Sequence, residues 1–219
     1  AASAREAQAL QQMANNLDPL ERPVILTGAV AELPALVAAL EEPTRFDVIV
    51  GRNALTAQPD KIAMLHILDA LLAPGGRLAL AQTVPQATQR IYALVDRRSL
   101  PADLAQGWQA AEEAIYAAPD DALVNWDAHD LPRMALAAGF EDVSLDVVAE
   151  TSEVRITPAL LARWFAENDD GGRPSYLQRL AQQLDGDALA FVRALIEQQL
   201  LGQTVAWGSA TAYLRGVKI

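Results

Sequence analysis

The sequence has no cysteine among its 219 residues, which excludes disulfide bonds and chemistry at a thiolate. Histidine is scarce as well: only His66 and His129 occur, too few for a metal site built from several histidines, and no metal site is expected. No apolar run reaches the length of a membrane span, so we expect a soluble, cytoplasmic protein without a membrane partner. Basic residues are in the minority, and the net charge of −11 repels phosphate backbones, so direct nucleic-acid binding is not expected.

Hydrophobic residues make up 52 % of the chain, enough for a substantial core. The clearest pattern begins with residues 46–50, a short β-branched run that predicts a strand buried on both faces, as in parallel sheets. Asp60 is a suitable N-cap for a helix over residues 61–73, where leucine and isoleucine recur at helical spacing. Pro74-Gly75-Gly76 ends that helix, and residues 77–81 form a second buried strand. The pattern therefore predicts a βαβ unit with two parallel strands.

The residues of this unit are more specific than its periodicity. The unit contains Phe46-Asp47-Val48-Ile49-Val50, then Asn53-Ala54-Leu55, then Leu72-Ala73-Pro74-Gly75-Gly76-Arg77-Leu78. These runs resemble the fourth strand, the helix after it and the entry to the fifth strand of class I S-adenosylmethionine-dependent methyltransferases. The resemblance implies an α/β fold, an incomplete Rossmann-like methyltransferase sheet with a helical insertion before the last strand.

The resemblance also implies where a cofactor would bind. In the family, the fourth strand ends beside the methyl group that is transferred, and the turn after the third strand reads the adenine ring. The corresponding candidates for binding S-adenosylmethionine are Gly28, Arg52, Asn53 and Ala54. No residue is assigned a catalytic role.

Two departures from the family bear on this cofactor site. The family's first two strands and its Gly-rich loop have no counterpart here, so the chain is expected to start within the architecture. The family's Gly-Asp-Ala is Gly28-Ala29-Val30 in this sequence, which removes the carboxylate that reads adenine. We therefore expect that S-adenosylmethionine does not bind this chain alone, and that methyl transfer would need a further N-terminal part.

The remaining elements extend this α/β pattern into a single methyltransferase-like domain. Further helices are predicted over residues 1–17, 31–40, 87–95, 104–117, 130–138, 158–166, 175–184 and 187–201. Further strands are predicted over residues 24–28, 143–148 and 206–214, with residues 150–156 continuing the second of them or leaving it as a ribbon. The sheet core is assigned to residues 1–84, 139–156 and 206–219, with a helical segment at 85–138 and a helical insertion at 157–205.

Several polar residues have a structural interpretation beside the functional one. Asn53 follows a strand at the carboxyl edge of the predicted sheet, where ligands bind in open α/β folds, but asparagine also suits a turn with an unusual backbone angle. Glu112 and Glu113 could serve as an acid and a base, but helix neighbours point apart. Five residues around Asn125-Trp126 make an acidic cluster whose carboxylates are of the type that binds hard cations, but its spacing fits no known metal loop, and we interpret it as a solvated loop with a helix cap at Asp130: Asp120, Asp121, Asp127, His129 and Asp130.

Four aromatic residues are expected to anchor the helical insertion to the sheet. They are Trp164, Phe165, Trp207 and Tyr213, and large aromatic side chains at such a junction are more often core anchors than a stacking platform. His66 lies mid-helix and is expected at the surface or boundary of the helix rather than in a catalytic site.

A closer resemblance covers almost the whole chain. Short runs are similar to the methyltransferase-like domain that some bacteria fuse to a RarA-type, replication-associated recombination AAA+ ATPase. They are V-G-R-N-A-L at 50–55, A-E-E-A-I-Y at 111–116, N-W-D at 125–127, R-W-F at 163–165, R-P-S-Y at 173–176 and Q-L-L-G-Q-T-V at 199–205. The resemblance implies an ATPase module in the same parent chain, although the sequence has no phosphate-binding loop of its own.

Two functions remain open at this point. The first is methyl transfer by the parent domain, and the second is a non-catalytic protein-interaction domain attached to a DNA-maintenance ATPase. Ala29 in place of the adenine-reading carboxylate favours the second. A sheet without two central strands would have uncovered edges, so we expect exposed strand edges, an unusual strand order or a homodimer that covers them.

Overall fold

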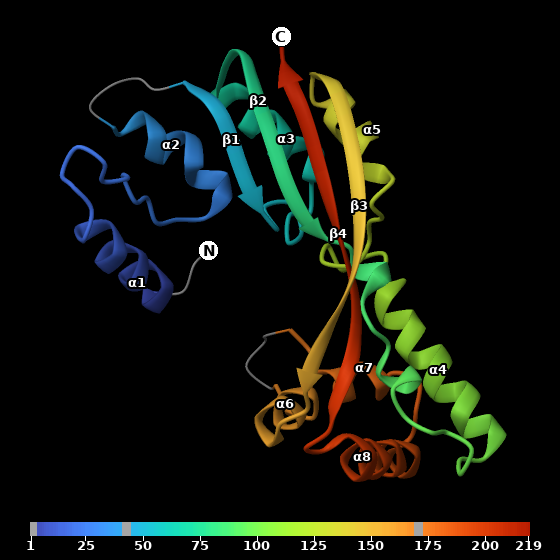
Figure 1. The fold of residues 1–219 in the computed structure, drawn as a ribbon. Helices are drawn as coiled ribbons and strands as arrows, with labels where there is room; N and C mark the ends of the chain where they lie inside the picture. The colour runs from blue at the N-terminus through green and yellow to red at the C-terminus, as the bar shows by residue number, and fades with distance from the viewer. Residues whose placement is uncertain (1–3, 41–44, 169–172) are drawn as a thin grey trace.

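The computed structural model describes residues 4–40, 45–168 and 173–219, and it has a mixed α/β fold. Its sheet has four strands, β1 (Phe46–Arg52), β2 (Leu72–Thr83), β3 (Phe140–Arg155) and β4 (Thr204–Lys218), in the order β1-β2-β4-β3. β1 runs parallel to β2, whereas β4 is antiparallel to both of its neighbours, β2 and β3 (Figure 1). Between β3 and β4 the described residues form three helices, which confirms the predicted α/β class with a helical insertion before the last strand.

The predicted βαβ unit is confirmed. Helix α3 (Lys61–Leu71) begins where expected, because a side-chain oxygen of Asp60 accepts a 2.8 Å hydrogen bond from the backbone N of Ala63. The reversal into β2 depends on Gly75, whose φ of +77° favours glycine, and on the close approach at Gly76. A Cβ added at Gly76 would lie 2.7 Å from the carbonyl oxygen of Ala73, so only glycine fits there.

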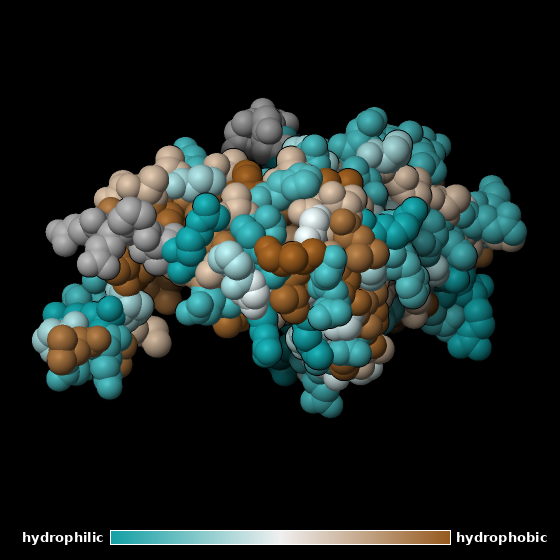
Figure 2. All heavy atoms as spheres, turned by 90° about the horizontal axis from the view of Figure 1, so that it is seen from above, coloured by the Kyte–Doolittle hydropathy of each residue, from teal (hydrophilic) through white to brown (hydrophobic). Residues whose placement is uncertain are grey.

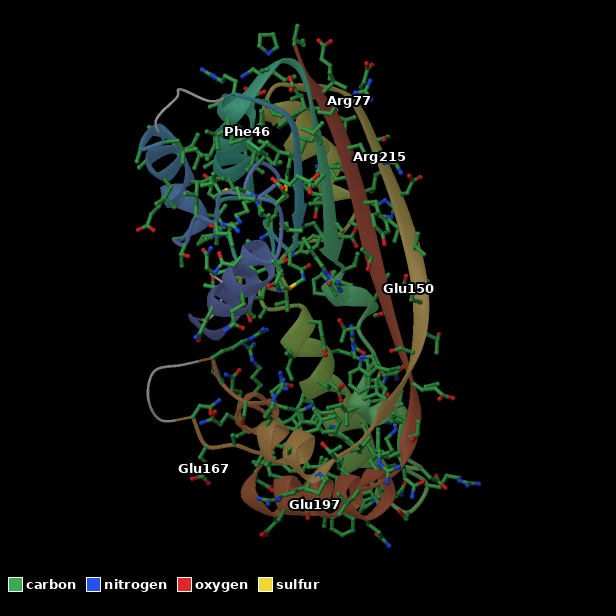
Figure 3. All side chains as sticks on the ribbon, turned by 60° about the vertical axis from the view of Figure 1, so that its left-hand side comes forward. Phe46, Arg77, Glu150, Glu167, Glu197 and Arg215 are labelled. Carbon is green, nitrogen blue, oxygen red and sulfur yellow. The ribbon has the colours of Figure 1, made fainter. Side chains whose placement is uncertain are left out.

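The prediction that β1 is buried on both faces is wrong. Val48 and Val50 are 55 % and 75 % exposed, because helices cover only one face of the sheet. The covering helices are α3 and α5 (Asp130–Ala137), and Figure 3 shows that helices lie on only one side of this sheet. A β-branched run indicates strand propensity rather than burial. The sequence alone therefore could not distinguish a strand buried on both faces from one covered on a single face.

The first core lies between the sheet and these two helices. It is built from alternate residues of the strands and from the facing sides of the helices, including Leu65, Leu78, Leu80, Leu131 and Leu214, all of which are buried. The same alternation places every second strand residue on the opposite, uncovered face.

A second core surrounds the far half of the β3–β4 ribbon. The two strands stay paired from Ser144 with Arg215 to Arg155 with Thr204, and they extend well beyond β1 and β2 (Figure 1). Four helices pack around this extension: α4 (Ala102–Tyr116), α6 (Pro158–Trp164), α7 (Tyr176–Leu180) and α8 (Gly186–Leu200). Trp108, Ile156 and Ile196 are fully buried among them. Residues 150–156 thus continue the strand, with residues 150–155 inside β3, one of the two alternatives that the sequence allowed.

The segment before β1 differs from the prediction. Helices α1 (Ala4–Asn15) and α2 (Leu33–Ala38) form, the latter preceded by a 3₁₀ turn, η1 (Val30–Glu32). Residues 24–28, predicted as a strand, adopt no regular structure, and Val24 is exposed. Leu10 and Met13 of α1 and Leu17 after it are exposed as well, whereas Ala14 is buried. On the surface seen from above, hydrophobic atoms lie between hydrophilic ones (Figure 2).

The helix predicted over residues 87–95 is replaced by two 3₁₀ turns, η2 (Pro85–Ala87) and η3 (Ile91–Ala93). Backbone amides here have partners outside the segment: the N–H of Gln89 donates to the carbonyl of Gly208, and that of Ile91 donates to Glu112. The Ile91 N–H would donate to the carbonyl of Ala87 in an α-helix over these residues, but here Glu112 accepts from it instead.

Candidate functional site

The carboxyl ends of β1 and β2 meet at one edge of the sheet, where the sequence places its candidate cofactor site. Asn53 ends β1 with a φ of +53°, and its backbone N donates to the carbonyl of Ala81 over 2.8 Å. Its side-chain oxygen accepts a 2.9 Å hydrogen bond from the backbone N of Thr83. The turn interpretation of Asn53 is therefore confirmed, and its acceptor oxygen already holds the two strand ends together.

A second polar residue at this edge was not found from the sequence. Gln82 is fully buried, and its side-chain oxygen accepts hydrogen bonds of 3.2 Å from the backbone N of Leu55 and the hydroxyl of Thr56. Its amide nitrogen has no partner among the described residues. The sequence does contain a signal for this residue. Gln82 follows Leu78 and Leu80 at alternate positions of a strand, and a polar side chain on the buried side of a strand needs hydrogen-bond partners.

The four candidate cofactor residues are only partly brought together. Arg52, Asn53 and Ala54 are consecutive at the end of β1, with Arg52 exposed and Ala54 packed against the first core. Gly28 lies before η1, where a Cβ would meet Glu32 and a leucine of α2 at 2.8 Å. Within the described ranges, no hydrogen bond joins Gly28 to the other three. Their assignment to a cofactor stays a prediction.

The uncovered side of the sheet, called here the open face, adjoins this edge. It consists of Val48, Val50, Arg52, Arg77, Ala79, Ala81, Thr83, Ser144, Asp146, Val148, Glu150, Thr211, Tyr213, Arg215 and Val217, which the strand register places side by side. A hollow of about 400 Å³ lies over Ala79 and Ala81, between the side chains of β1 and those of Tyr213 and Arg215. The hollow exists because two small residues lie in a row of larger ones. Tyr213, predicted as a core anchor, is 37 % exposed here.

The two adjacent glutamates of α4 both contact residues 90–92, but one is buried and the other half-exposed. Glu112 is fully buried and accepts three hydrogen bonds: from the backbone N of Ile91 over 2.5 Å, from that of Tyr92 over 3.0 Å, and from the hydroxyl of Tyr176 over 2.6 Å. Glu113 is half-exposed and pairs with Arg90 at 3.1 Å.

Burial raises the pKa of the Glu112 carboxyl, although its three hydrogen bonds oppose that shift. Burial also raises the pKa of the Tyr176 hydroxyl, and the negative charge of Glu112 adds to the effect. Glu112 has no exposed surface through which a substrate could approach, so it joins segments of the second core rather than acting as an acid or base.

The acidic loop is organised by ion pairs. Asp121 pairs with Arg179 at 2.8 Å and with Arg173 at 3.2 Å. Partial burial would raise the pKa of Asp121, but the backbone N of Leu123 and the two guanidinium groups outweigh burial and lower it. Among the described residues, no group of three or more acidic or histidine side chains could hold a metal ion. The predicted cap at Asp130 is wrong, because Asp130 is the first residue of α5. His129 occupies the cap position of α5 without a capping bond.

Comparisons with known proteins give the following likenesses. No protein-family model matches the chain, and no curated protein matches it. Among solved structures, the YcgJ protein of Bacillus subtilis is similar with a TM-score of 0.48 and 14 % identity, over 99 % of this chain and 80 % of that one. An arsenic(III) S-adenosylmethionine methyltransferase from Chlamydomonas reinhardtii gives a TM-score of 0.37 and 16 % identity, over 88 % and 44 %.

Phosphoethanolamine N-methyltransferase 2 from Haemonchus contortus, a complex with S-adenosylhomocysteine, gives a TM-score of 0.32 and 13 % identity. This chain covers 33 % of that enzyme, with 79 % of its own residues matched. Solved structures similar to this chain thus include S-adenosylmethionine-dependent methyltransferases, but likenesses of this size do not carry the function of one protein to another. Within the described residues, none of the helices has the length and apolar character needed to pass through a bilayer.

Proposed function

We propose that the chain is a non-catalytic protein-interaction domain. The observation that supports it is the open face. Every strand of the sheet contributes to this face, and Val48, Val50 and Val148 are exposed on it. Val48 and Val50 lie on the same side of one edge strand, and neighbouring exposed apolar residues on a sheet are typical of surfaces that receive another protein. The side-chain oxygens of Asn53 and Gln82 at the sheet edge accept structural hydrogen bonds, so these two oxygens are not free to bind a substrate.

The edge of β1 next to the open face supports the proposal that a second copy of the chain binds there. No described residue forms a backbone hydrogen bond with the outer side of β1. The other edge strand, β3, is protected by a bulge and by charged residues such as Glu141, Asp146 and Glu150, whereas β1 has Val48 and Val50 at its centre. Antiparallel pairing about Ile49 would place Val48 of one copy opposite Val50 of the other.

Sedimentation velocity of the wild-type chain and two lysine variants tests this homodimer. Val50→Lys places a charge at the centre of the proposed contact and should give a monomer. Val148→Lys is the matched control, because it adds the same charge to the open face but on β3, and it should remain a dimer. A wild-type chain that is a monomer throughout the concentration series, or equal dissociation of both variants, would refute the β1 contact.

We also propose that the natural partner is a RarA-type ATPase module in the same parent chain. This proposal rests on the resemblance of short sequence runs to such fused domains, and the open face offers a surface for the module. The test is sedimentation of this chain mixed with a separately purified RarA-type ATPase. Co-migration that Val50→Lys or Arg215→Gln abolishes would support docking at the open face, and independent migration would contradict it.

A second candidate function is binding of S-adenosylmethionine for methyl transfer. The observation in its favour is Arg52, which lies at the carboxyl end of β1, borders the 400 Å³ hollow and has no ion pair among the described residues. The described residues do not complete such a site, because the Asn53 oxygen is occupied and Ala29 has no side-chain acceptor.

Calorimetric titration with S-adenosylhomocysteine decides between these alternatives. We expect no heat of binding from this chain, and a heat from a chain extended at its N-terminus would support the cofactor site. Absence of binding by both folded proteins would exclude it. Binding by the present chain that Arg52→Gln removes would contradict the interaction-only proposal.

A further inference from the structure

A cavity in the second core has the features of a small-molecule site. Its volume is about 210 Å³, and it opens between the ends of α4 and α6, helix α7 and strand β4. The residues that define its character are Tyr116, Trp164, Arg173, Tyr176, Arg179 and Trp207. It lies away from the open face, and none of these residues belongs to the candidate cofactor site.

Two tryptophans form an aromatic wall of this cavity. The ring centroids of Trp164 and Trp207 are 6.1 Å apart with 28° between the ring planes, so the indoles stack on each other. Both are partly exposed, whereas Trp108 and Trp126 are buried in the two cores. Stacked indoles that border a cavity present flat apolar surface to a planar ring.

Two arginines line the same cavity and share one carboxylate. A single carboxylate oxygen of Asp121 accepts from both Arg179 and Arg173, so Asp121 neutralises only one of these two guanidinium groups. The buried Glu112 carboxyl lies behind the cavity residue Tyr176 and accepts a hydrogen bond from its hydroxyl. The Arg179 side chain is only 15 % exposed and is held in place by this pair. Close by, Arg90 lies over the Tyr116 ring at 3.7 Å and is itself paired with Glu113. The guanidinium group that Asp121 does not neutralise is suited to an anion, although the chain as a whole has a net charge of −11.

We propose that this cavity binds a planar aromatic ring carrying a carboxylate or phosphate group, with the ring against Trp164 and Trp207 and the anionic group at Arg173 and Arg179. The proposal goes beyond the protein-interaction function, because it concerns a different surface and a small ligand. It combines three separate observations: a cavity of suitable size, a stacked aromatic wall and two guanidinium groups that share one carboxylate.

The indole N–H signals of the ¹⁵N-labelled chain provide a direct test, because each of the 4 tryptophans gives its own signal. The probes are naphthalene-2-carboxylate and 2-naphthyl phosphate, and the matched neutral probe is naphthalene-2-carboxamide. We expect either anion to shift the signals of Trp164 and Trp207 and to leave the signal of Trp126, which is buried in the first core, unchanged. The anion that binds with the higher affinity identifies the preferred acidic group. Equal shifts with the neutral amide, or no shift of the two cavity signals, would overturn the proposal.

Arginine variants show whether the charge acts at this cavity. Arg173→Gln should weaken binding of the anionic probe about tenfold, as expected for loss of one charge-assisted hydrogen bond. Its side chain is 49 % exposed, so the fold should tolerate the change. The control Arg193→Gln removes a similarly exposed arginine of α8 that pairs with Glu197. The control Arg215→Gln alters the hollow on the open face. If either control weakens binding as much as Arg173→Gln does, the probe binds elsewhere and the proposal is wrong.

Discussion

The carboxylate of Glu112 joins three segments that are far apart in the sequence. It accepts from the backbone of Ile91 and Tyr92 in η3 and from the hydroxyl of Tyr176 at the start of α7. The Trp108 indole N–H donates in turn to the Tyr176 hydroxyl over 2.7 Å. The sequence places Glu112 on a helix beside Glu113, but a partner 64 residues away cannot be inferred from helical periodicity.

Replacing Glu112 by glutamine should destabilise the fold. Glutamine keeps one acceptor oxygen but turns an amide N–H₂ toward a group that donates, so at least one buried donor loses its partner. We expect the free energy of unfolding to fall by about 2 kcal/mol. Glu113→Gln is the matched control on the same helix, and it should cost less than about 1 kcal/mol because its ion pair is half-exposed. Urea denaturation measures both, and equal losses would contradict the role assigned to Glu112.

The raised pKa of Glu112 predicts a pH dependence of stability. In the window between its unfolded-state pKa near 4.5 and its higher folded-state pKa, the folded state binds more protons than the unfolded state. The contribution of this carboxyl to stability is therefore fully present below the unfolded-state pKa, and it is lost as the pH rises through the folded-state pKa. The difference in unfolding free energy between wild type and Glu112→Gln should decrease from acidic to neutral pH. A difference that grows with pH would show that the hydrogen bonds outweigh burial.

Among the elements, local patterns predict helices and strands well and fail where long-range pairing decides. Asp60 caps its helix at the predicted place, because capping depends on neighbouring residues only, and Thr157 and Ser175 cap α6 and α7 in the same way. Residues 24–28 have strand-like composition but no neighbouring strand to pair with, so no strand forms. Similarly, residues 87–95 lose their helix because β4 and Glu112 take their backbone donors. The open face and the aromatic cavity both depend on strand order and register, which the sequence does not specify.

The connection between the ends of β1 and β2 depends on Asn53. Asn53→Ala removes the acceptor for the Thr83 backbone N and places alanine at a positive φ, so we expect a loss of about 2 kcal/mol in unfolding free energy. Asn53→Asp keeps an acceptor oxygen and tolerates the same backbone angle, so it should lose less than about 1 kcal/mol. Thermal unfolding of both variants distinguishes the two. A large loss in Asn53→Asp as well would indicate that the side-chain amide nitrogen has a structural role.

At the scale of the whole molecule, two cores share one antiparallel ribbon. The half of the β3–β4 ribbon that contains Phe140 and Lys218 belongs to the sheet with β1 and β2. The half that contains Arg155 and Thr204 belongs to the core around α4 and α8. Because each core has its own buried residues, we expect that each can open while the other remains folded. The open face is on the first half and the aromatic cavity on the second, so we expect the protein-binding and ligand-binding proposals to concern parts of the chain that open separately.

Hydrogen exchange along β4 measures this independence, since the strand runs through both cores. Ile196→Ala removes a fully buried side chain of the second core and should cost about 2–5 kcal/mol, which corresponds to more than roughly tenfold faster opening there. We expect faster exchange in β4 residues 204–208 and little change in residues 211–217. Leu214→Ala, in the first core, should produce the reverse pattern. Equal acceleration along all of β4 in both variants would mean that the ribbon couples the two cores into one cooperative unit, and a ligand in the aromatic cavity would then also stabilise the sheet that carries the open face.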